Sequence, residues 1–103
     1  METYLPKEYK GKIVHCRRQK YDVYVGRPSN FGNPFEIGKG GTREEVIEKF
    51  KIYFMGRLHK DEQFKRAVNK LKGKVLACWC YPKDCHARII IDYLEGGKNE
   101  KNE

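Results

Sequence analysis

Three cysteines and a histidine fall within nine residues, in Cys78-Trp79-Cys80 and Cys85-His86. Thiolates and imidazoles are good ligands for zinc, and cysteines also hold iron–sulfur clusters. The spacing differs from that of a standard zinc finger, but such a density of ligand-type side chains indicates a metal site or a catalytic site. We predict Cys78, Cys80, Cys85 and His86 as metal ligands. Zinc is favoured over an iron–sulfur cluster, and a site without a cofactor is the remaining alternative.

The same residues also suit thiolate chemistry. Cys85 is predicted to lie in the first turn of a helix, where unpaired backbone N–H groups and the helix dipole lower the pKa of a cysteine. Lys83 would lower this pKa further, whereas Asp84 would oppose the effect. If the protein is an enzyme, we expect Cys85 to act as a nucleophile or metal ligand, and His86 as a ligand or general acid–base. A third interpretation is that these cysteines are buried small apolar residues.

A second segment, Gly26 to Phe35, is rich in glycine, proline and asparagine. A long stretch without regular structure is typical of a functional loop, although this one matches neither a P-loop nor a dinucleotide fingerprint. Arg27 can bind a phosphate or carboxylate through two parallel hydrogen bonds. Asn30 and Asn33 can hydrogen-bond a base edge or a sugar. We predict Arg27, Asn30, Asn33 and Lys83 as ligand-binding residues.

The strands that position these segments are short. Alternating or continuous apolar and β-branched residues predict them. The predicted strands cover residues 12–16, 21–25 and 75–80. Between the second and third strands, two helical patterns follow each other, and a last helix follows the third strand. The order β-β-α-α-β-α predicts an α/β fold, a small layered sandwich in which helices pack on a short sheet.

The three helices carry start signals. Thr42 with Glu45 three residues later forms a capping-box pattern. Asp61 is a candidate cap for the second helix and Asp84 for the third, which is expected to begin at Cys85. The first helix carries one apolar stripe at helical spacing. That stripe consists of Val46, Ile47, Phe50, Phe54 and Leu58.

Strand geometry constrains the cysteine site. Side chains alternate along a strand, so Cys78 and Cys80 should point the same way and Trp79 the other way, into the core. The β-carbons of such a pair are roughly 7 Å apart on an extended strand, so the strand must bend at Trp79 if both thiolates are to bind one ion. If the first and third strands are parallel neighbours, His15 or Cys16 is a candidate for a further ligand.

The charge balance suggests a polyanionic partner. The formal net charge is +8, and the excess of basic residues lies in segments 1–27 and 60–74 and not in the C-terminal tail. A basic domain of this kind suits a nucleotide or a nucleic acid. If the basic residues form one face beside the site, long-range attraction and local recognition act together. The residues concerned are Arg17, Arg18, Lys65, Lys70 and Lys72.

Length and composition predict the organisation and the compartment. With 103 residues the chain is expected to form a single α/β domain over 1–97, followed by a polar tail over 98–103. Clustered cysteines argue against a disulfide framework. Residues 1–12 are charged and no apolar run approaches the ~20 residues of a membrane span. We therefore expect a cytoplasmic protein with no membrane partner.

The two motifs together resemble an uncharacterised family of bacteria, archaea and phages, known only as a domain of unknown function. The family carries Tyr-Asp-Val-Tyr-Ile-Gly-Arg-Pro, then Gly-Asn-Pro-Phe, and near its end Cys-Trp-Cys-x4-Cys-His-Gly. The matching segments here are Tyr21 to Pro28, Gly32 to Phe35, and Cys78 to His86. The resemblance covers roughly residues 13–95. It supports the site and implies no particular reaction.

One departure concerns the residues after the histidine. The family usually has glycine and then aspartate there, whereas this chain has Ala87 and Arg88. If the family's aspartate is catalytic, Arg88 cannot replace it, which weakens an enzymatic role.

Three functional hypotheses follow. The first is a protein that binds a nucleotide or nucleic acid beside a metal or reactive thiolate, and acts on a nucleotide or modified base. The second is a non-catalytic nucleic-acid-binding module with a structural zinc. The third is a thiol redox or regulatory protein.

Overall fold

The computed structural model describes residues 4–96, so the tail predicted over 98–103 lies outside the described residues. The predicted order of elements and the α/β class are confirmed, with one short 3-10 helix added near the start. The elements are η1 (Lys7–Tyr9), β1 (Ile13–His15), β2 (Val23–Tyr24), α1 (Arg43–Lys60), α2 (Glu62–Asn69), β3 (Leu76–Cys78) and α3 (Ala87–Leu94).

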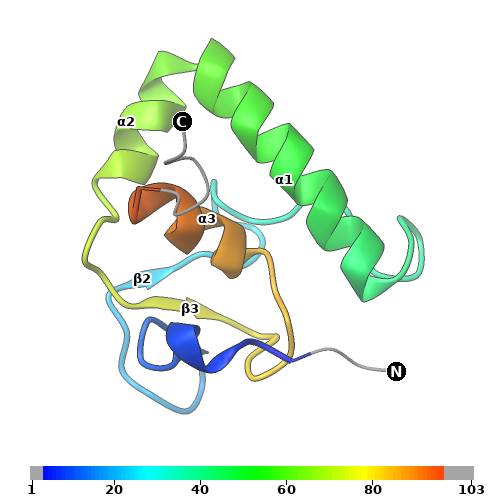
Figure 1. The fold of residues 1–103 in the computed structure, drawn as a ribbon, viewed down its shortest axis with the longest axis vertical. Helices are drawn as coiled ribbons and strands as arrows, with labels where there is room; N and C mark the ends of the chain where they lie inside the picture. The colour runs from blue at the N-terminus through cyan, green and yellow to red at the C-terminus, as the bar shows by residue number, and fades with distance from the viewer. Residues whose placement is uncertain (1–3, 97–103) are drawn as a thin grey trace.

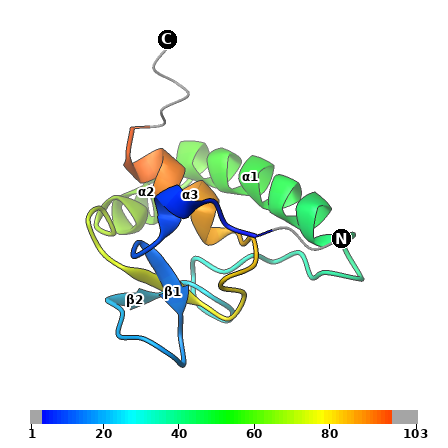
Figure 2. The ribbon, with the colours of Figure 1, turned by 60° about the horizontal axis from the view of Figure 1, so that its bottom comes forward.

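The sheet has three strands in the order β1-β3-β2, and β3 runs parallel to both neighbours. His15 is paired with Cys78, and Tyr24 with Ala77, so all three strands end at the same edge. The segment that follows β2 therefore starts beside the end of β3. Figure 2 shows this segment, in cyan to green, passing beneath α1 to the start of that helix.

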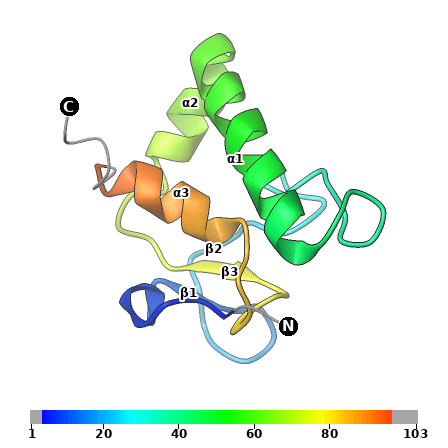
Figure 3. The same ribbon diagram turned by 45° about the vertical axis from the view of Figure 1, so that its right-hand side comes forward.

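The three helices cover one face of the sheet (Figure 3), and η1 lies beside α3, where the Tyr9 hydroxyl donates to the Asp92 carboxylate. Figure 1 shows α1 as the longest of them, with α2 folded back beside it. The capping box predicted at Thr42 is confirmed: the Thr42 hydroxyl accepts from the Glu45 N–H, and the Glu45 carboxylate accepts from the Thr42 N–H. Asp61 caps α2 by accepting from the Phe64 N–H at 3.0 Å.

The core lies between these helices and the sheet. All five residues of the apolar stripe of α1 are buried. Phe50 and Phe54 are fully buried and stack on each other, with ring centroids 5.4 Å apart. The Phe50 end of this stack contacts the site, because the Phe50 ring packs against the His86 ring with centroids 5.0 Å apart. The core of the domain and the predicted site are therefore in direct contact.

Two predictions around β3 are wrong. The strand ends at Cys78, and the chain bends at Trp79 and Cys80. As a result Trp79 does not enter the core: its side chain is 54% exposed. This is the bend that Cys78 and Cys80 would need if both thiolates were to bind one ion. Strand alternation does not apply beyond Cys78, which is why it misplaced the indole ring.

The last helix also begins later than predicted. α3 starts at Ala87 with His86 as its N-cap; the His86 side chain makes no cap hydrogen bond, and the Ala87 N–H donates to the Cys85 sulfur at 3.3 Å. Asp84 binds elsewhere: its carboxylate accepts from the Cys85 N–H at 2.9 Å and pairs with Arg88. Cys85 therefore lies just before the helix and not in its first turn.

None of the helices within residues 4–96 combines the length and the apolar composition that a membrane span requires.

Candidate metal centre and adjoining cavity

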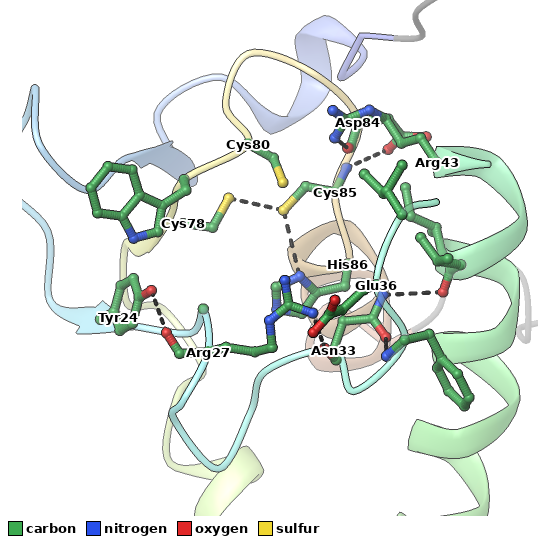
Figure 4. A pocket seen from close by; sticks show the side chains of 16 residues that line it. Tyr24, Arg27, Asn33, Glu36, Arg43, Cys78, Cys80, Asp84, Cys85 and His86 are labelled. Carbon is green, nitrogen blue, oxygen red and sulfur yellow. Dashed lines mark hydrogen bonds between the residues drawn. The ribbon is translucent and has the colours of Figure 1, made fainter. Parts of the chain in front are cut away.

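The three sulfurs of Cys78, Cys80 and Cys85 lie within 4.8 Å of one another. Cys78 comes from the end of β3, Cys80 from the bend, and Cys85 from the segment just before α3. The sulfurs of Cys78 and Cys85 are 2.9 Å apart and both side chains are buried. Figure 4 shows the three side chains directed toward one another. The convergence predicted from the sequence is confirmed, while the role of these residues stays a prediction.

His86 lies next to this group but is not within 4.8 Å of all three sulfurs. Its Nδ1 lies 3.8 Å from the Cys85 sulfur, and its Nε2 lies 2.8 Å from the Val25 carbonyl oxygen. Because a carbonyl only accepts, Nε2 carries the proton and Nδ1 presents a lone pair on the side of the cysteines. Burial lowers the pKa of His86, which keeps the ring neutral. A neutral imidazole fixed by a backbone carbonyl is the usual state of a metal-ligating histidine.

The pKa values of the three thiols depend on one another. Hydrogen bonds from Cys78 and Cys85 lower the pKa of Cys80, and Arg43 lowers it further. The hydrogen bond to Cys80 raises the pKa of Cys78, and hydrogen bonds to Cys78 and Cys80 raise the pKa of Cys85. The cluster thus favours one thiolate, at Cys80. The Cys85 sulfur is buried and lies just before the helix, and the expected role of Cys85 as a nucleophile stays a prediction.

A cavity of about 390 Å³ opens on the cluster. This volume is within the range of small-molecule sites. Cys78, Cys80, Cys85 and His86 all line it, together with residues of the loop after β2 and of the first turns of α1. The glycine-rich loop and the cysteines share this cavity, because β2 and β3 are parallel and end at the same edge.

Two arginines line this cavity, together with the acidic residues Glu36 and Asp84. Arg27 extends from the loop after β2, and Arg43 from the first turn of α1. The Nη1 of Arg27 donates to the Asn33 carbonyl at 3.2 Å, and the Nη1 of Arg43 donates to the Asp84 carbonyl at 3.0 Å. Both guanidinium groups are therefore held at the cavity by backbone oxygens. In Figure 4 they approach the cluster from different elements.

The loop is fixed by its own polar residues. The side chain of Asn33 donates to the Val46 carbonyl at 3.1 Å and accepts from the Phe35 N–H at 2.9 Å. Asn33 lines the cavity as predicted, but these bonds show that its amide holds the loop on α1. Gly26 is also required here, since a β-carbon would lie 2.5 Å from the Tyr24 hydroxyl, which donates to the Arg27 carbonyl.

Two predicted ligand-binding residues do not line the cavity. Asn30 is turned toward α1, where its side-chain oxygen accepts from Arg57 at 2.8 Å. Lys83 pairs with Tyr4 in an antiparallel bridge that ties the N-terminal segment to the turn before Cys85. The side chain of Asn30 is thus held on α1, whereas the bridge at Lys83 is a pairing of the backbone.

Asp84 and Arg88 form an ion pair at the entry to α3. Arg88 donates from Nε to Oδ1 at 2.8 Å and from Nη2 to Oδ2 at 3.2 Å. The same Oδ1 accepts from the Cys85 N–H at 2.9 Å. Arg88, which departs from the family resemblance, therefore helps to hold the backbone of Cys85 in place.

The candidates for a further ligand lie outside the cluster. The Cys16 sulfur is not part of the group within 4.8 Å, although the Cys16 N–H donates to the Cys78 carbonyl at 3.0 Å. The His15 Nδ1 accepts from the Arg17 N–H at 3.1 Å, and the ring packs edge-on against Trp79. β1 and β3 are parallel neighbours, which was the condition for this candidacy, but neither His15 nor Cys16 joins the three sulfurs.

Sequence reasoning missed several residues that line the cavity. These are Tyr24, Glu36, Arg43 and Trp79. Arg43 directly follows a helix cap, a position that carries no functional signal in the sequence. Trp79 was assigned to the core because the strand was expected to continue through Cys80.

The basic segments start from opposite ends of the sheet. Arg17 follows the end of β1, whereas Lys70 and Lys72 precede β3. Because β1 and β3 are parallel, these residues do not gather at one edge. The single basic face considered from the sequence is therefore not supported, and the charge closest to the cluster comes from Arg27 and Arg43.

Fold and site define a small α/β protein with a thiolate cluster at the carboxyl edge of a three-stranded parallel sheet. The chain belongs to the family described as "Domain of unknown function (DUF4326)", whose model matches residues 8–96. This confirms the resemblance to an uncharacterised family.

Two relatives show how widely the family occurs. The chain is 38% identical over 80 residues to "Uncharacterized 12.4 kDa protein in nrdA-td intergenic region" of Enterobacteria phage T4, covering 77% of this chain and 72% of the relative. It is 34% identical over 92 residues to "Uncharacterized protein R718" of Acanthamoeba polyphaga mimivirus, covering 71% and 66%. No solved structure matches the chain.

Proposed function

We propose that the protein is a nucleotide- or nucleic-acid-binding module built around a zinc centre. The sulfurs of Cys78, Cys80 and Cys85 and the Nδ1 of His86 would bind the ion. The observation that carries this proposal is the convergence of three sulfurs within 4.8 Å beside a neutral, oriented imidazole. Three thiolates and one imidazole form a common ligand set for structural zinc.

The three sulfurs fit this ion after a small adjustment, and the imidazole of His86, which lies outside the 4.8 Å group, would have to move closer to them. Thiolates that share a tetrahedral zinc at about 2.3 Å lie roughly 3.8 Å apart. The Cys78 and Cys85 sulfurs, at 2.9 Å, would therefore move apart by about 1 Å on binding, a side-chain movement. A centre of one Zn²⁺ and three thiolates would carry a net charge of −1. The positive charge of Arg43, beside Cys80, offsets this negative charge.

Four protein ligands close the coordination sphere, which is typical of structural and not catalytic zinc. This favours the non-catalytic alternative over chemistry on a base. The cavity next to the centre supports the second half of the proposal, since two arginines and several aromatic side chains line it. Guanidinium groups suit phosphate, and aromatic rings suit bases. We also place the protein in the cytoplasm, because its four cysteines are free thiols.

Metal analysis of protein purified without added metal tests the zinc centre. We expect close to one zinc per chain in the wild type and in Cys16→Ser, and a loss of at least nine-tenths of it in Cys80→Ser. Cys16 is the matched control because it is a free cysteine outside the cluster. A brown colour together with bound iron would show that the site holds an iron–sulfur cluster and not zinc. A metal-free wild type with a reactive Cys80 would support the thiol hypothesis instead.

A further inference from the structure

Trp79 is an exposed aromatic side chain at the edge of the cavity. It lies directly between two proposed zinc ligands, lines the cavity, and is 54% exposed. An indole ring removes a large apolar area from water when it is covered. A tryptophan left open on a cavity that two arginines also line is therefore a candidate contact for a flat aromatic ligand.

We propose that Trp79 is the base-stacking surface of the cavity, so that its ligand is a nucleoside phosphate with the base on the indole and the phosphate at Arg27. This inference rests on the proposed function and specifies which part of a nucleotide or nucleic acid enters. It requires one unstacked base and one phosphate, and no duplex.

The ring is held in place before any ligand arrives. The guanidinium of Arg17 lies over the indole at 5.4 Å from its centroid, and the His15 ring packs edge-on at 5.6 Å. The backbone on either side of Trp79 is fixed by Cys78 at the end of β3 and by Cys80 in the cluster. A ring that is already oriented loses little freedom on binding, which favours affinity.

The phosphate position follows from the residues beside the ring. Tyr24 also lines the cavity, and its hydroxyl donates to the Arg27 carbonyl at 2.7 Å. Figure 4 shows Tyr24 and Arg27 next to each other, with the Arg27 side chain extending toward the cluster. Trp79, Tyr24 and Arg27 thus line the same cavity, which offers an aromatic surface for a base and a guanidinium for a phosphate. Phosphate alone would leave the indole unused.

Fluorescence of the zinc-containing full chain gives a direct test, because Trp79 is the sole tryptophan. Adenosine 5′-monophosphate, ribose 5-phosphate and a short single-stranded oligonucleotide are titrated against the protein, and calorimetry measures each affinity independently. We expect the adenine-containing ligands to quench Trp79 and to bind about tenfold tighter than ribose 5-phosphate. Tighter binding of adenosine 5′-monophosphate would identify the ligand as a mononucleotide, and tighter binding of the oligonucleotide would identify it as a single-stranded nucleic acid.

Variants assign the effect to the ring. Trp79→Leu should bind adenosine 5′-monophosphate no better than ribose 5-phosphate, whereas Trp79→Phe should keep part of the advantage. Tyr21→Leu is the control, since Tyr21 is an exposed aromatic residue that does not line the cavity. Thermal unfolding establishes that each variant is folded.

The outcomes separate the two proposals. Equal affinity for adenosine 5′-monophosphate and ribose 5-phosphate overturns the stacking surface but leaves the anion-binding cavity. An unchanged base preference in Trp79→Leu also overturns it. If no ligand binds the zinc-loaded wild type, the nucleotide-binding half of the proposed function fails, whatever the metal content. Absence of zinc with intact base preference overturns only the metal centre.

Discussion

Removal of zinc with a chelator is expected to lower the free energy of unfolding by about 4 kcal/mol when the free zinc concentration of the reference state is roughly 1,000 times the dissociation constant. The reason is that the ion would join three segments with little regular structure between them: the end of β3, the bend at Cys80 and the entry to α3. Denaturant titration of the same preparation, with zinc and with chelator, measures the difference.

The matched control for this experiment is the variant Cys85→Ser. It lacks one proposed ligand, so the chelator should leave its unfolding curve unchanged. Identical curves for the wild type with and without chelator would contradict a zinc centre that contributes to folding.

Substitution of Phe50 by alanine is expected to have the second large effect, on stability and on the site together. Phe50 is fully buried and its ring packs against His86 at 5.0 Å. Loss of a buried phenylalanine costs about 3–5 kcal/mol, which is a large part of the stability of a small domain. The imidazole of His86 would also lose its packing contact with the Phe50 ring, so zinc affinity should fall.

Phe54→Ala separates these two effects. Phe54 is equally buried and stacks on Phe50, but its other ring contacts are with Phe64 and Tyr93, away from the site. It should destabilise the protein by a similar amount, measured in the presence of chelator, while zinc affinity stays near that of the wild type. Where alanine prevents folding, the leucine variants at both positions provide the same comparison. Equal zinc affinity in the two variants would show that Phe50 does not support His86.

The parts of the fold that follow from local patterns could be predicted from the sequence. The start of α1 is determined by a reciprocal hydrogen-bond pair between Thr42 and Glu45, and its buried face by the helical spacing of its apolar residues. The convergence of the cysteines also follows, because a strand end and a helix entry lie close in any parallel α/β unit.

The remaining parts depend on contacts that a sequence pattern does not encode. Trp79 continues the apolar run of β3 in the sequence, but the chain bends there and turns the ring outward. Asn30 and Asn33 look alike in the sequence, yet one binds Arg57 on the surface and the other fixes the loop against α1. Arg43 reaches the cavity only because α1 begins beside the cluster.

The position of the cysteine cluster was predicted more closely than the charge state of its thiols. Cys85 was expected in the first turn of a helix, where its thiolate would be favoured, but α3 begins two residues later. The neighbouring thiols and Arg43 instead favour the charge on Cys80. Such coupling depends on the three-dimensional approach of side chains and not on spacing along the chain.

X-ray absorption at the zinc edge of the purified protein is the most direct test of the proposed zinc centre, because it reports the atoms bound to the ion. We expect three sulfur neighbours at about 2.3 Å and one imidazole nitrogen at about 2.0–2.1 Å. His86→Ala should lose the imidazole signal and keep the three sulfurs, whereas Cys16→Ser should give the wild-type spectrum. A wild-type spectrum with fewer than three sulfur neighbours, or protein that binds no zinc at all, would contradict the proposed centre.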